Sequence, residues 1–267
     1  VCCAQAYFIG SASFDASDAA AFIAKERGHE VTLYEAGDVL GGNMRLAAYP
    51  PGKGDITNMI RSYIHRCQKD GVKIVMNCEV TPELIKEEKP DSVIIATGSK
   101  TLILPIEGID NPAIIHGSDL LDGKRAAGKK VLVVGGGMVG CETAAFLGEQ
   151  EHDVTVIEFR DTVGADVIHE HRVYLMKDFE DYGIKEITGA KVCKFYEDGV
   201  EYETADGVRH ESRGYDSVIL SMGFRNYNPL EEKIKDLVPE THVIGDAIRA
   251  RRALDATKEA YEVASRI

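Results

Sequence analysis

Short apolar runs alternate along the chain with longer stretches in which apolar residues recur at helical spacing. Residues 131–134 and 154–157 are apolar or β-branched at every position, which is typical of strands buried on both faces of a parallel sheet. Residues 56–69 instead show the one-sided pattern of an amphipathic helix. The alternation of the two patterns predicts an α/β fold with parallel sheets.

Two segments of the chain share one layout. Residues 6–35 contain an apolar strand, a loop of small residues, an Ala-rich helix and a second strand that ends in Glu35. Residues 129–158 repeat the order and end in Glu158. Each segment is a βαβ unit, and a duplication of this size predicts two Rossmann-like dinucleotide-binding domains.

The remaining pattern is consistent with this architecture. Thr81 and Pro82 have the residue types of a helix N-cap and a first helical residue. Further helices are predicted at residues 81–85, 174–182 and 253–266, further strands at 73–76, 92–96, 191–196, 199–204, 217–223 and 242–244, and a crossover at 105–112.

The loop of the second segment has the spacing G-x-G-x-x-G. Its members are Gly135, Gly137, Met138, Val139 and Gly140. The pattern alone is weak, but here it follows a β-branched strand and opens a helix, which is the context that a dinucleotide requires. The first glycine permits a tight turn, the second lets the backbone approach a pyrophosphate, and the third lets helix and strand pack closely. The alternative is a glycine-rich turn without a ligand.

Glu158 and Arg160 decide which nicotinamide cofactor is predicted. A carboxylate at the end of the second strand accepts hydrogen bonds from the adenosine ribose and disfavours a 2′-phosphate. Arg160, two residues later, weakens this inference because an arginine there can hold the phosphate. NAD(H) is therefore predicted, with NADP as the disfavoured alternative.

The loop of the first segment departs from the pattern. Counting back from Glu35 by the spacing of the second segment places Ala12, Phe14 and Ser17 at the glycine positions, whereas counting from Gly10 places Gly10, Ala12 and Asp15 there. A phenylalanine would fill the space of the pyrophosphate, and an aspartate would repel it. Three interpretations stay open: the nucleotide site is lost, it binds with altered geometry, or the sequence of this stretch is in error.

Composition narrows the possible partners. The formal charge of −13 repels phosphate backbones, so no nucleic-acid partner is expected. No apolar run is long enough to span a membrane and no secretory signal is visible, so a cytoplasmic protein is expected. The six cysteines show no metal-binding spacing and are expected to be reduced thiols. The chain begins at Val1, which suggests a fragment or a processed chain.

Several sequence stretches together resemble a known group of flavoproteins. They include residues 28–35, 40–42, 47–53 (AAYPPGK), 80–83, 89–91, 95–98, 135–142 (GGGMVGCE) and 243–247. Their joint order is similar to the C-terminal half of the NADH:flavin oxidoreductases of the 2,4-dienoyl-CoA reductase, 2-enoate reductase and trimethylamine dehydrogenase group. This half has the pyridine nucleotide-disulfide oxidoreductase-like fold. The resemblance covers residues 20–267.

The resemblance implies a cofactor set and residue roles. FAD (ADP in trimethylamine dehydrogenase) would lie on the first unit and NAD(H) on the second. The residues implied to bind FAD, besides Gly10 and Ala12 of the first loop, are Glu35 (adenosine ribose), Gly41 and Gly42 (phosphates and ribityl chain), Val80 (adenine, through its backbone), Ala96, Thr97 and Gly98 (pyrophosphate), and Gly245 and Asp246 (ribityl chain). Gly223, which ends a strand, joins the cofactor-binding candidates. The alternative for Gly245 and Asp246 is an ordinary turn and helix cap.

The domain prediction follows from the same resemblance. The FAD-binding domain would comprise residues 1–107 and 222–267, with an NAD-binding domain of residues 108–221 inserted in it. No acid–base catalytic residue and no metal ligand are predicted, because the cofactors carry the chemistry.

The family's full-length enzymes also carry an N-terminal FMN barrel and a 4Fe-4S cluster, which this sequence lacks. We therefore expect an NADH-oxidising flavin oxidoreductase module that passes electrons to such a partner domain or subunit. The alternative is a non-catalytic, ADP-binding structural domain. An oligomer is expected, although the sequence does not define its order.

Overall fold

The computed structural model describes residues 5–10 and 14–267, which form two compact units. Unit 1 contains the described residues up to Ala48, together with Gly54–Lys100 and Phe224–Ile267. Unit 2 contains Tyr49–Lys53 and Thr101–Gly223. The assignment of FAD to one unit and NAD(H) to the other stays a prediction at this point.

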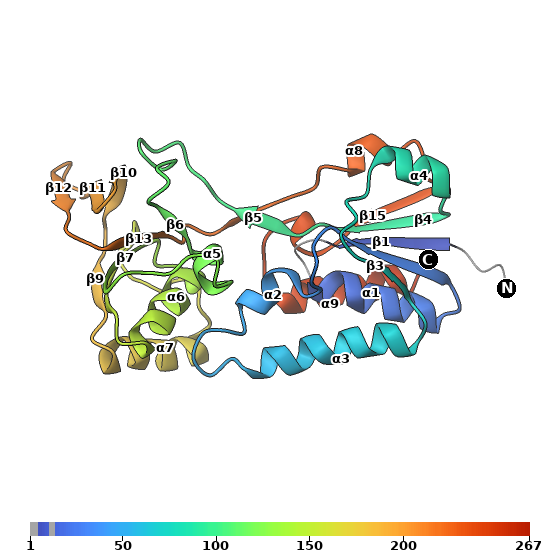
Figure 1. Cartoon of the computed structure of the whole chain (residues 1–267), viewed down its shortest axis with the longest axis horizontal. Helices are drawn as coiled ribbons and strands as arrows, with labels where there is room; N and C mark the ends of the chain where they lie inside the picture. The colour runs from blue at the N-terminus through green and yellow to red at the C-terminus, as the bar shows by residue number, and fades with distance from the viewer. Residues whose placement is uncertain (1–4, 11–13) are drawn as a thin grey trace. The chain divides into compact units, whose positions relative to one another are not determined.

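Unit 1 is built on a five-stranded parallel sheet with the order β15-β4-β1-β2-β3 (Figure 1). Its strands are β1 (Gln5–Gly10), β2 (Glu30–Glu35), β3 (Lys73–Val75), β4 (Ser92–Ala96) and β15 (Glu240–Val243). β4 is buried along its whole length, as its unbroken apolar run predicts. Two short strands, β5 (Ser99–Thr101) and β14 (Phe224–Asn226), pair with each other.

Helices cover both faces of this sheet (Figure 1). One face carries α1 (Phe14–Glu26), α3 (Asp55–Lys69) and α9 (Ala253–Ala264), and the other carries α4 (Pro82–Glu88) and α8 (Glu231–Ile234). Alanines repeat every four residues along α1 (Ala16, Ala20, Ala24) and α9 (Ala256, Ala260, Ala264), and all six are buried in one core. Such small side chains let these two helices approach each other and the sheet closely.

Two shorter elements complete unit 1. They are α2 (Gly42–Leu46) and the 3-10 turn η1 (Gly245–Ala247). At the start of α4 the Thr81 hydroxyl accepts a hydrogen bond from the N–H of Leu84 at 3.3 Å, so the predicted N-cap is confirmed.

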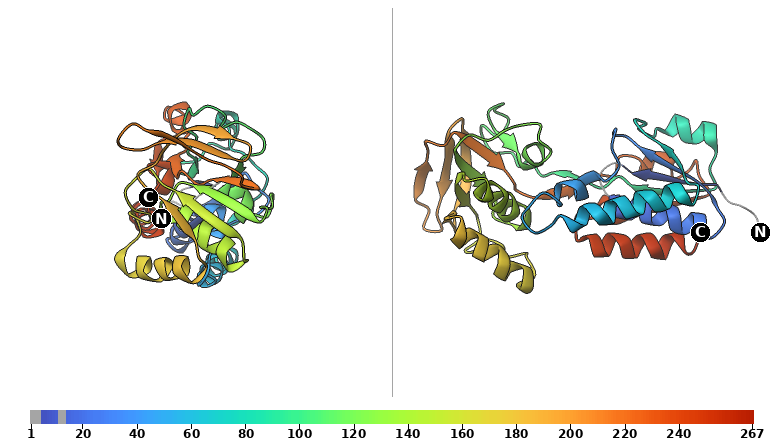
Figure 2. Two further views of the ribbon diagram at one scale, coloured as in Figure 1. Left: turned by 90° about the vertical axis from the view of Figure 1, so that its left-hand side faces the viewer. Right: turned by 60° about the horizontal axis from the view of Figure 1, so that its bottom comes forward.

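Unit 2 repeats the parallel design with the strand order β6-β13-β7-β8-β9. Figure 2 shows the ribbon from two further sides. Its strands are β6 (Ile115–His116), β7 (Lys130–Val134), β8 (Asp153–Ile157), β9 (Lys185–Ile187) and β13 (Ser217–Leu220), and its helices are α5 (Gly117–Leu121), α6 (Met138–Glu149) and α7 (His169–Asp181). An antiparallel sheet of β10 (Lys191–Tyr196), β11 (Gly199–Glu203) and β12 (Arg209–Ser212) contributes Phe195 and Val200 to a second core.

The predicted α/β fold with two dinucleotide-binding units is therefore confirmed, and the differences concern element ends. α1 begins at Phe14, five residues before the Ala-rich stretch of residues 19–25 that predicts it, and α7 begins at His169 rather than at residue 174. The first turn of α7 carries polar side chains and the exposed Val173, so it lacks an apolar face that the sequence pattern could reveal. β13 ends at Leu220, three residues before the predicted end.

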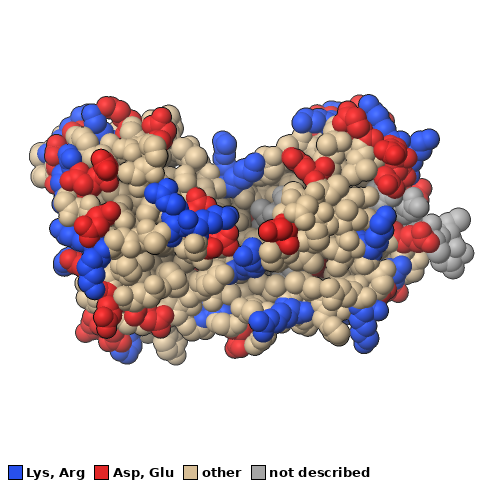
Figure 3. Space-filling view, in the orientation of Figure 1, with Lys and Arg blue, Asp and Glu red and all other residues tan. Residues whose placement is uncertain are grey.

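Charged side chains are interspersed on the face of the molecule shown in Figure 3. On that face, neither the acidic nor the basic side chains gather into one large patch. Among the described residues, no helix is both long enough and apolar enough to cross a membrane.

Candidate functional site

The glycine loop of unit 2 lies between β7 and α6, where the predicted pattern places it. Gly135 has a φ of +106°, and a Cβ added to it would lie 2.4 Å from the carbonyl oxygen of Ser221. A Cβ added to Gly140 would lie 1.8 Å from the carbonyl oxygen of Gly135. Both positions therefore require glycine, which fits the tight turn and the close packing of helix and strand that the motif predicts.

Glu158 ties this loop to the end of β8. Its carboxylate accepts the N–H of Gly136 at 2.6 Å and the N–H of Arg160 at 2.9 Å. A carboxylate has about four acceptor positions, so these two bonds leave capacity for ribose hydroxyls. The contacts also hold the carboxylate in place before any ligand arrives.

A cavity of about 370 Å³ opens over the loop. The predicted residues that line it are Gly135, Gly137, Met138, Val139, Glu158, Arg160 and Gly223. Gly140 lies beneath the loop, as its proposed packing role requires. The cavity is thus lined by backbone groups, apolar side chains and three charged side chains, those of Glu158, Arg160 and Asp166, and such a mixture of apolar lining and a few polar groups fits a dinucleotide.

Among the lining residues that the sequence did not predict, Asp166 and Ser221 are the polar ones. Ser221 is 7% exposed, and its hydroxyl has no hydrogen-bond partner among the residues that the structure describes. The Asp166 carboxylate accepts a hydrogen bond from the N–H of Met138 at 2.9 Å. Neither residue lies in a motif, so only the folded chain reveals them. A second cavity of about 510 Å³ adjoins the first and shares Phe159 and Arg160 with it.

The site residues predicted for unit 1 gather at the carboxyl edge of its sheet. Gly10 ends β1 and lies opposite Glu35 on one side and Ala96 on the other. The N–H of Ile244, which precedes Gly245, donates to the carbonyl of Ile95 at 2.9 Å. Parallel strands of open α/β sheets bind ligands at this edge.

Strand register distinguishes the two ways of counting the first loop. In unit 2, Val134 lies opposite Ile157, which brings Gly135 level with Glu158. In unit 1, Gly10 lies opposite Glu35. Gly10 therefore takes the place of the first glycine, and the register contradicts the count that puts Phe14 at the pyrophosphate. Ala12 lies outside the described residues.

Glu35 is buried at the end of β2. Its carboxylate accepts the N–H of Gly37 at 2.7 Å. Burial raises the pKa of this carboxyl above its ordinary value, and the hydrogen bond from Gly37 partly opposes the rise. A buried acid at a strand end fits the predicted ribose contact, which stays a prediction.

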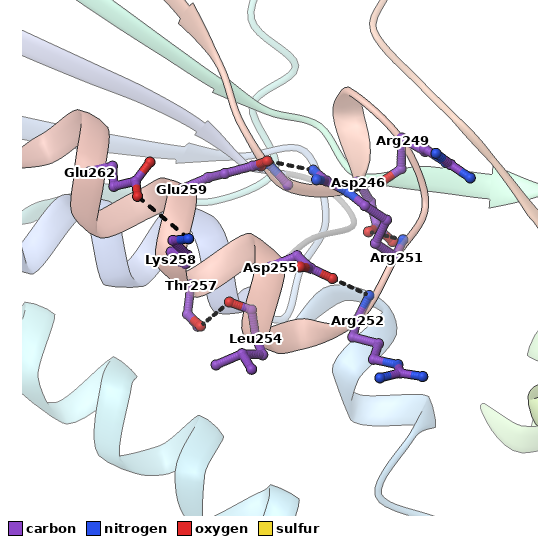
Figure 4. A network of polar contacts seen from close by, with 11 residues as sticks. Asp246, Arg249, Arg251, Arg252, Leu254, Asp255, Thr257, Lys258, Glu259 and Glu262 are labelled. Atoms are coloured by element: carbon purple, nitrogen blue, oxygen red, sulfur yellow. Dashed lines mark hydrogen bonds and ion pairs between the residues drawn. The ribbon is translucent and has the colours of Figure 1, made fainter. Parts of the chain in front are cut away.

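Asp246 is fixed by bonds from two directions, and Figure 4 shows the side on which Arg251 lies. It accepts the hydroxyl of Ser99 at 3.0 Å and the N–H of Arg251 at 3.0 Å. Glu259 of α9 accepts the N–H of Gly245 at 2.8 Å and pairs with the Arg251 guanidinium at 2.6 Å. The turn that carries Asp246 is thereby anchored to α9.

The other predicted unit 1 residues have mixed surroundings. Gly41, with a φ of +121°, and Gly42 open α2, which places two left-handed residues beside each other. The hydroxyl of Thr97 donates to the carbonyl of Tyr227, and the carbonyl of Gly98 accepts the N–H of Tyr227. The side chain of Val80 is buried in the core, so only its backbone is left for the predicted adenine contact.

The Pro-Pro-Gly-Lys stretch contributes to unit 2. Lys53 pairs with Glu142, a residue of α6 whose side chain is 6% exposed. Glu142 belongs to the stretch 135–142 of the family resemblance, which implies no role for it. A buried carboxylate requires such a partner, because an unpaired buried charge is costly.

Four of the six cysteines lie in the part of the chain that the structure describes, and none of these four forms a disulfide. Cys67, Cys78, Cys141 and Cys193 are free, and among the described residues no cluster of three or more His, Cys, Asp or Glu could hold a metal. Burial raises the pKa of Cys141 to about 12 and also raises that of Cys67. Both thiols therefore stay protonated at neutral pH, as structural cysteines do.

Comparisons with known proteins agree with this geometry. The family model "Pyridine nucleotide-disulphide oxidoreductase" matches residues 9–244. NADH oxidase of Thermoanaerobacter brockii is 33% identical over 93% of this chain and 39% of that enzyme. Bilirubin reductase of Mediterraneibacter gnavus is 32% identical over 92% of this chain and 38% of that enzyme.

A solved structure has a similar fold. The structure of 2-naphthoyl-CoA reductase with 2-naphthoyl-CoA matches with a TM-score of 0.91 and 31% identity, over 97% of this chain and 39% of that chain. The chain thus spans about two fifths of the length of the proteins it matches. These matches confirm the predicted resemblance to the nucleotide-binding part of such reductases and the prediction of an oxidoreductase. The chain belongs to the pyridine nucleotide-disulphide oxidoreductase family.

Proposed function

We propose that this chain is an NADH-oxidising flavoprotein module in which NADH held by unit 2 reduces FAD held by unit 1. The glycine loop of unit 2 carries the proposal, because Gly135 and Gly140 leave no room for a side chain and Glu158 is already fixed beside them. FAD, when bound, supplies a flavin N5 that accepts the hydride from C4 of NADH. The protein binds and orients the two cofactors and keeps water away.

The residues of each unit support the proposal that unit 2 binds NADH and unit 1 binds FAD. In unit 2, the N–H groups at the start of α6 would hold the pyrophosphate of NADH, and Glu158 would accept its adenosine ribose hydroxyls. In unit 1, Glu35 would hold the adenosine ribose of FAD and Asp246 its ribityl chain. Asp246 is held ready by Ser99 and by the backbone of Arg251.

A partner is part of the proposal. The chain spans about two fifths of its relatives, which include an NADH oxidase and reductases of large substrates. We propose that electrons pass from FAD to a domain or subunit with FMN and a 4Fe-4S cluster, which would reduce the final substrate. This module would then serve as the electron entry port of a larger, cytoplasmic and oligomeric enzyme.

One observation favours a second function, a nucleotide-binding domain without hydride transfer. The first loop lacks two of its three glycines, since Gly10 is followed by Ala12 and Asp15 at the other positions. An aspartate close to a pyrophosphate opposes binding. In this alternative, ADP occupies unit 1 and the site in unit 2 has no redox partner.

An absorption spectrum of the purified chain separates the two functions. We expect a flavin band near ~450 nm, typical of a bound flavin cofactor, that NADH bleaches under anaerobic conditions. NADPH at the same concentration should bleach it more slowly, because Glu158 repels a 2′-phosphate. A chain that stays colourless after addition of FAD, or whose flavin NADH does not bleach, would contradict the proposal.

A further inference from the structure

The N-terminus of α6 already has an anion beside it. Asp166 lies between β8 and α7, and its Oδ1 accepts the N–H of Met138, the first residue of α6, at 2.9 Å. The helix has no acidic residue in its first turn and no side-chain cap from Gly137. A carboxylate is stabilised there by the unpaired N–H groups and the helix dipole, which also attract a diphosphate.

The carboxylate of Asp166 occupies ligand space. Asp166 lines the 370 Å³ cavity together with Gly135, Gly137 and Met138. A Cβ added to Gly137 would lie 3.3 Å and 3.5 Å from the two carboxylate oxygens, so the carboxylate lies directly over this glycine. Ser221 also lines this cavity, and its buried hydroxyl has no hydrogen-bond partner among the described residues.

The backbone around Asp166 is anchored. Val163 and Val167 on either side of it are 1% and 8% exposed and belong to the core of unit 2. The N–H of Gly164 donates to the carbonyl of Gly136 in the glycine loop at 2.7 Å. Rotation of the side chain therefore moves the carboxylate aside, while the main chain keeps Asp166 next to the loop.

We propose that Asp166 sets the affinity of unit 2 for dinucleotides by competing with their diphosphate for the N-terminus of α6. The diphosphate displaces the carboxylate when it binds, and the carboxylate caps the helix again when the nucleotide leaves. Because no lysine or arginine among the described residues forms an ion pair with Asp166, its charge also opposes the bound diphosphate. This inference rests on the proposed assignment of NADH to unit 2, and it implies that Asp166 promotes release of oxidised NAD.

Calorimetric titration of the full chain with three probes tests this inference. NADH and ADP-ribose carry the diphosphate, whereas adenosine lacks it. We expect Asp166→Asn and Asp166→Ala each to lower the Kd for NADH and ADP-ribose about three- to tenfold, the scale of one charge at a helix end. The Kd for adenosine should not change.

Asp161→Asn is the matched control. Asp161 lies on the same connection and its loss changes the net charge equally, but it lines the adjoining cavity and not the loop. An unchanged or raised Kd for NADH in both Asp166 variants would overturn the inference. An equal gain in Asp161→Asn, or a gain for adenosine, would also overturn it, because the effect would then not arise at the diphosphate.

The outcomes also separate this inference from the proposed function. If the Asp166 variants bind NADH more tightly but flavin in the chain is not bleached by NADH, only the hydride transfer is wrong. If neither the wild-type chain nor either variant binds NADH or ADP-ribose, unit 2 is not a dinucleotide site and both proposals fail. Melting curves of each variant confirm that the titrated protein is folded, which is expected because Asp166 is exposed.

Discussion

Glu35 and Glu158 end equivalent strands, and each accepts the N–H of the residue two positions later. The two carboxylates differ in their remaining contacts. Glu158 also accepts the N–H of Gly136 from its glycine loop, whereas the equivalent residue of the first loop lies outside the described residues. Glu35 is buried, and this burial raises the pKa of its carboxyl. At neutral pH, the folded chain without nucleotide therefore holds an unfavourable negative charge at this position.

We predict that Glu35→Gln stabilises the unliganded chain at pH 7 and weakens its binding of FAD and ADP. The folded pKa lies above the ordinary value of 4.5. Folding is therefore favoured while the group is protonated, and this contribution is lost as pH rises from about 4.5 through the folded pKa. The variant should melt at a higher temperature than wild type at pH 7, and the difference should vanish below about pH 4.

Glu30→Gln provides the control for this measurement. Glu30 begins the same strand and is exposed, so its replacement should leave melting and nucleotide binding unchanged. A lower melting temperature of Glu35→Gln at pH 7 would show that the carboxylate stabilises the fold, contrary to the prediction.

Gly140 offers a sharper test of the second loop. In Gly140→Ala, the new methyl group would collide with the carbonyl of Gly135, so α6 must move away from β7. We expect unit 2 to lose about 2–4 kcal/mol of stability and NADH binding to be lost, as measured by denaturant unfolding and titration. Gly54→Ala is the matched control, since Gly54 has a helical φ of −54° and open space around it. NADH binding by Gly140→Ala at wild-type affinity would contradict the proposed role.

Among the elements, α9 has a role that extends beyond its alanine face. Glu259 on α9 holds both Gly245 and Arg251, and Arg251 in turn holds Asp246 (Figure 4). The helix thus positions a cofactor-binding candidate that it does not itself carry. Such support keeps the side chain in one geometry before binding, which reduces the cost of ordering it.

We predict that Glu259→Ala weakens FAD binding although Glu259 is not a predicted FAD contact. Without it, the N–H of Gly245 and the Arg251 guanidinium lose their acceptor, and the turn that bears Asp246 loosens. The Kd for FAD should rise about tenfold, the loss of one charge-assisted hydrogen bond. Glu262→Ala on the same helix removes only a weak pair with Lys258 at 3.9 Å and should bind FAD as wild type does. If both variants bind FAD equally well, the geometry of η1 that FAD binding requires does not depend on the contacts of Glu259.

The sequence predicted elements well where their signal is local. β4 and β7 are short runs of apolar residues, and the loop at Gly135 is a contiguous motif between a strand and a helix. Short elements such as α2 and α8 went unpredicted because five or four residues are too few to show a period.

The site residues that the sequence did not predict were missed for a different reason. Asp166 reaches Met138 across 28 positions of sequence, and Lys53 reaches Glu142 across 89. These residues come together only when the chain folds, so no local sequence motif could predict the two contacts. The first loop was ambiguous for the same reason, since strand register and not spacing aligns Gly10 with Glu35.

For the whole molecule, the family name raises the question of whether a disulfide takes part in electron transfer. Electron transfer through a disulfide needs a pair of cysteines, whereas the four described cysteines are free. Cys67 and Cys141 lie in the cores of different units, and both have raised pKa values because of burial. Thiolates are the reactive form, so these two residues are poor redox groups.

We therefore predict that electron transfer from NADH to FAD survives alkylation of every accessible thiol. In a variant with Cys2 and Cys3 replaced by serine, N-ethylmaleimide should modify the partly exposed Cys78 and Cys193 and spare Cys67 and Cys141. Peptide mass spectrometry identifies the modified cysteines. The same protein in denaturant, in which all four cysteines should react, provides the control. Bleaching of the flavin by NADH should keep its rate, because the hydride passes directly between the cofactors and needs no thiol. Loss of bleaching upon modification of Cys78 or Cys193 would place a cysteine in the electron path and contradict direct hydride transfer.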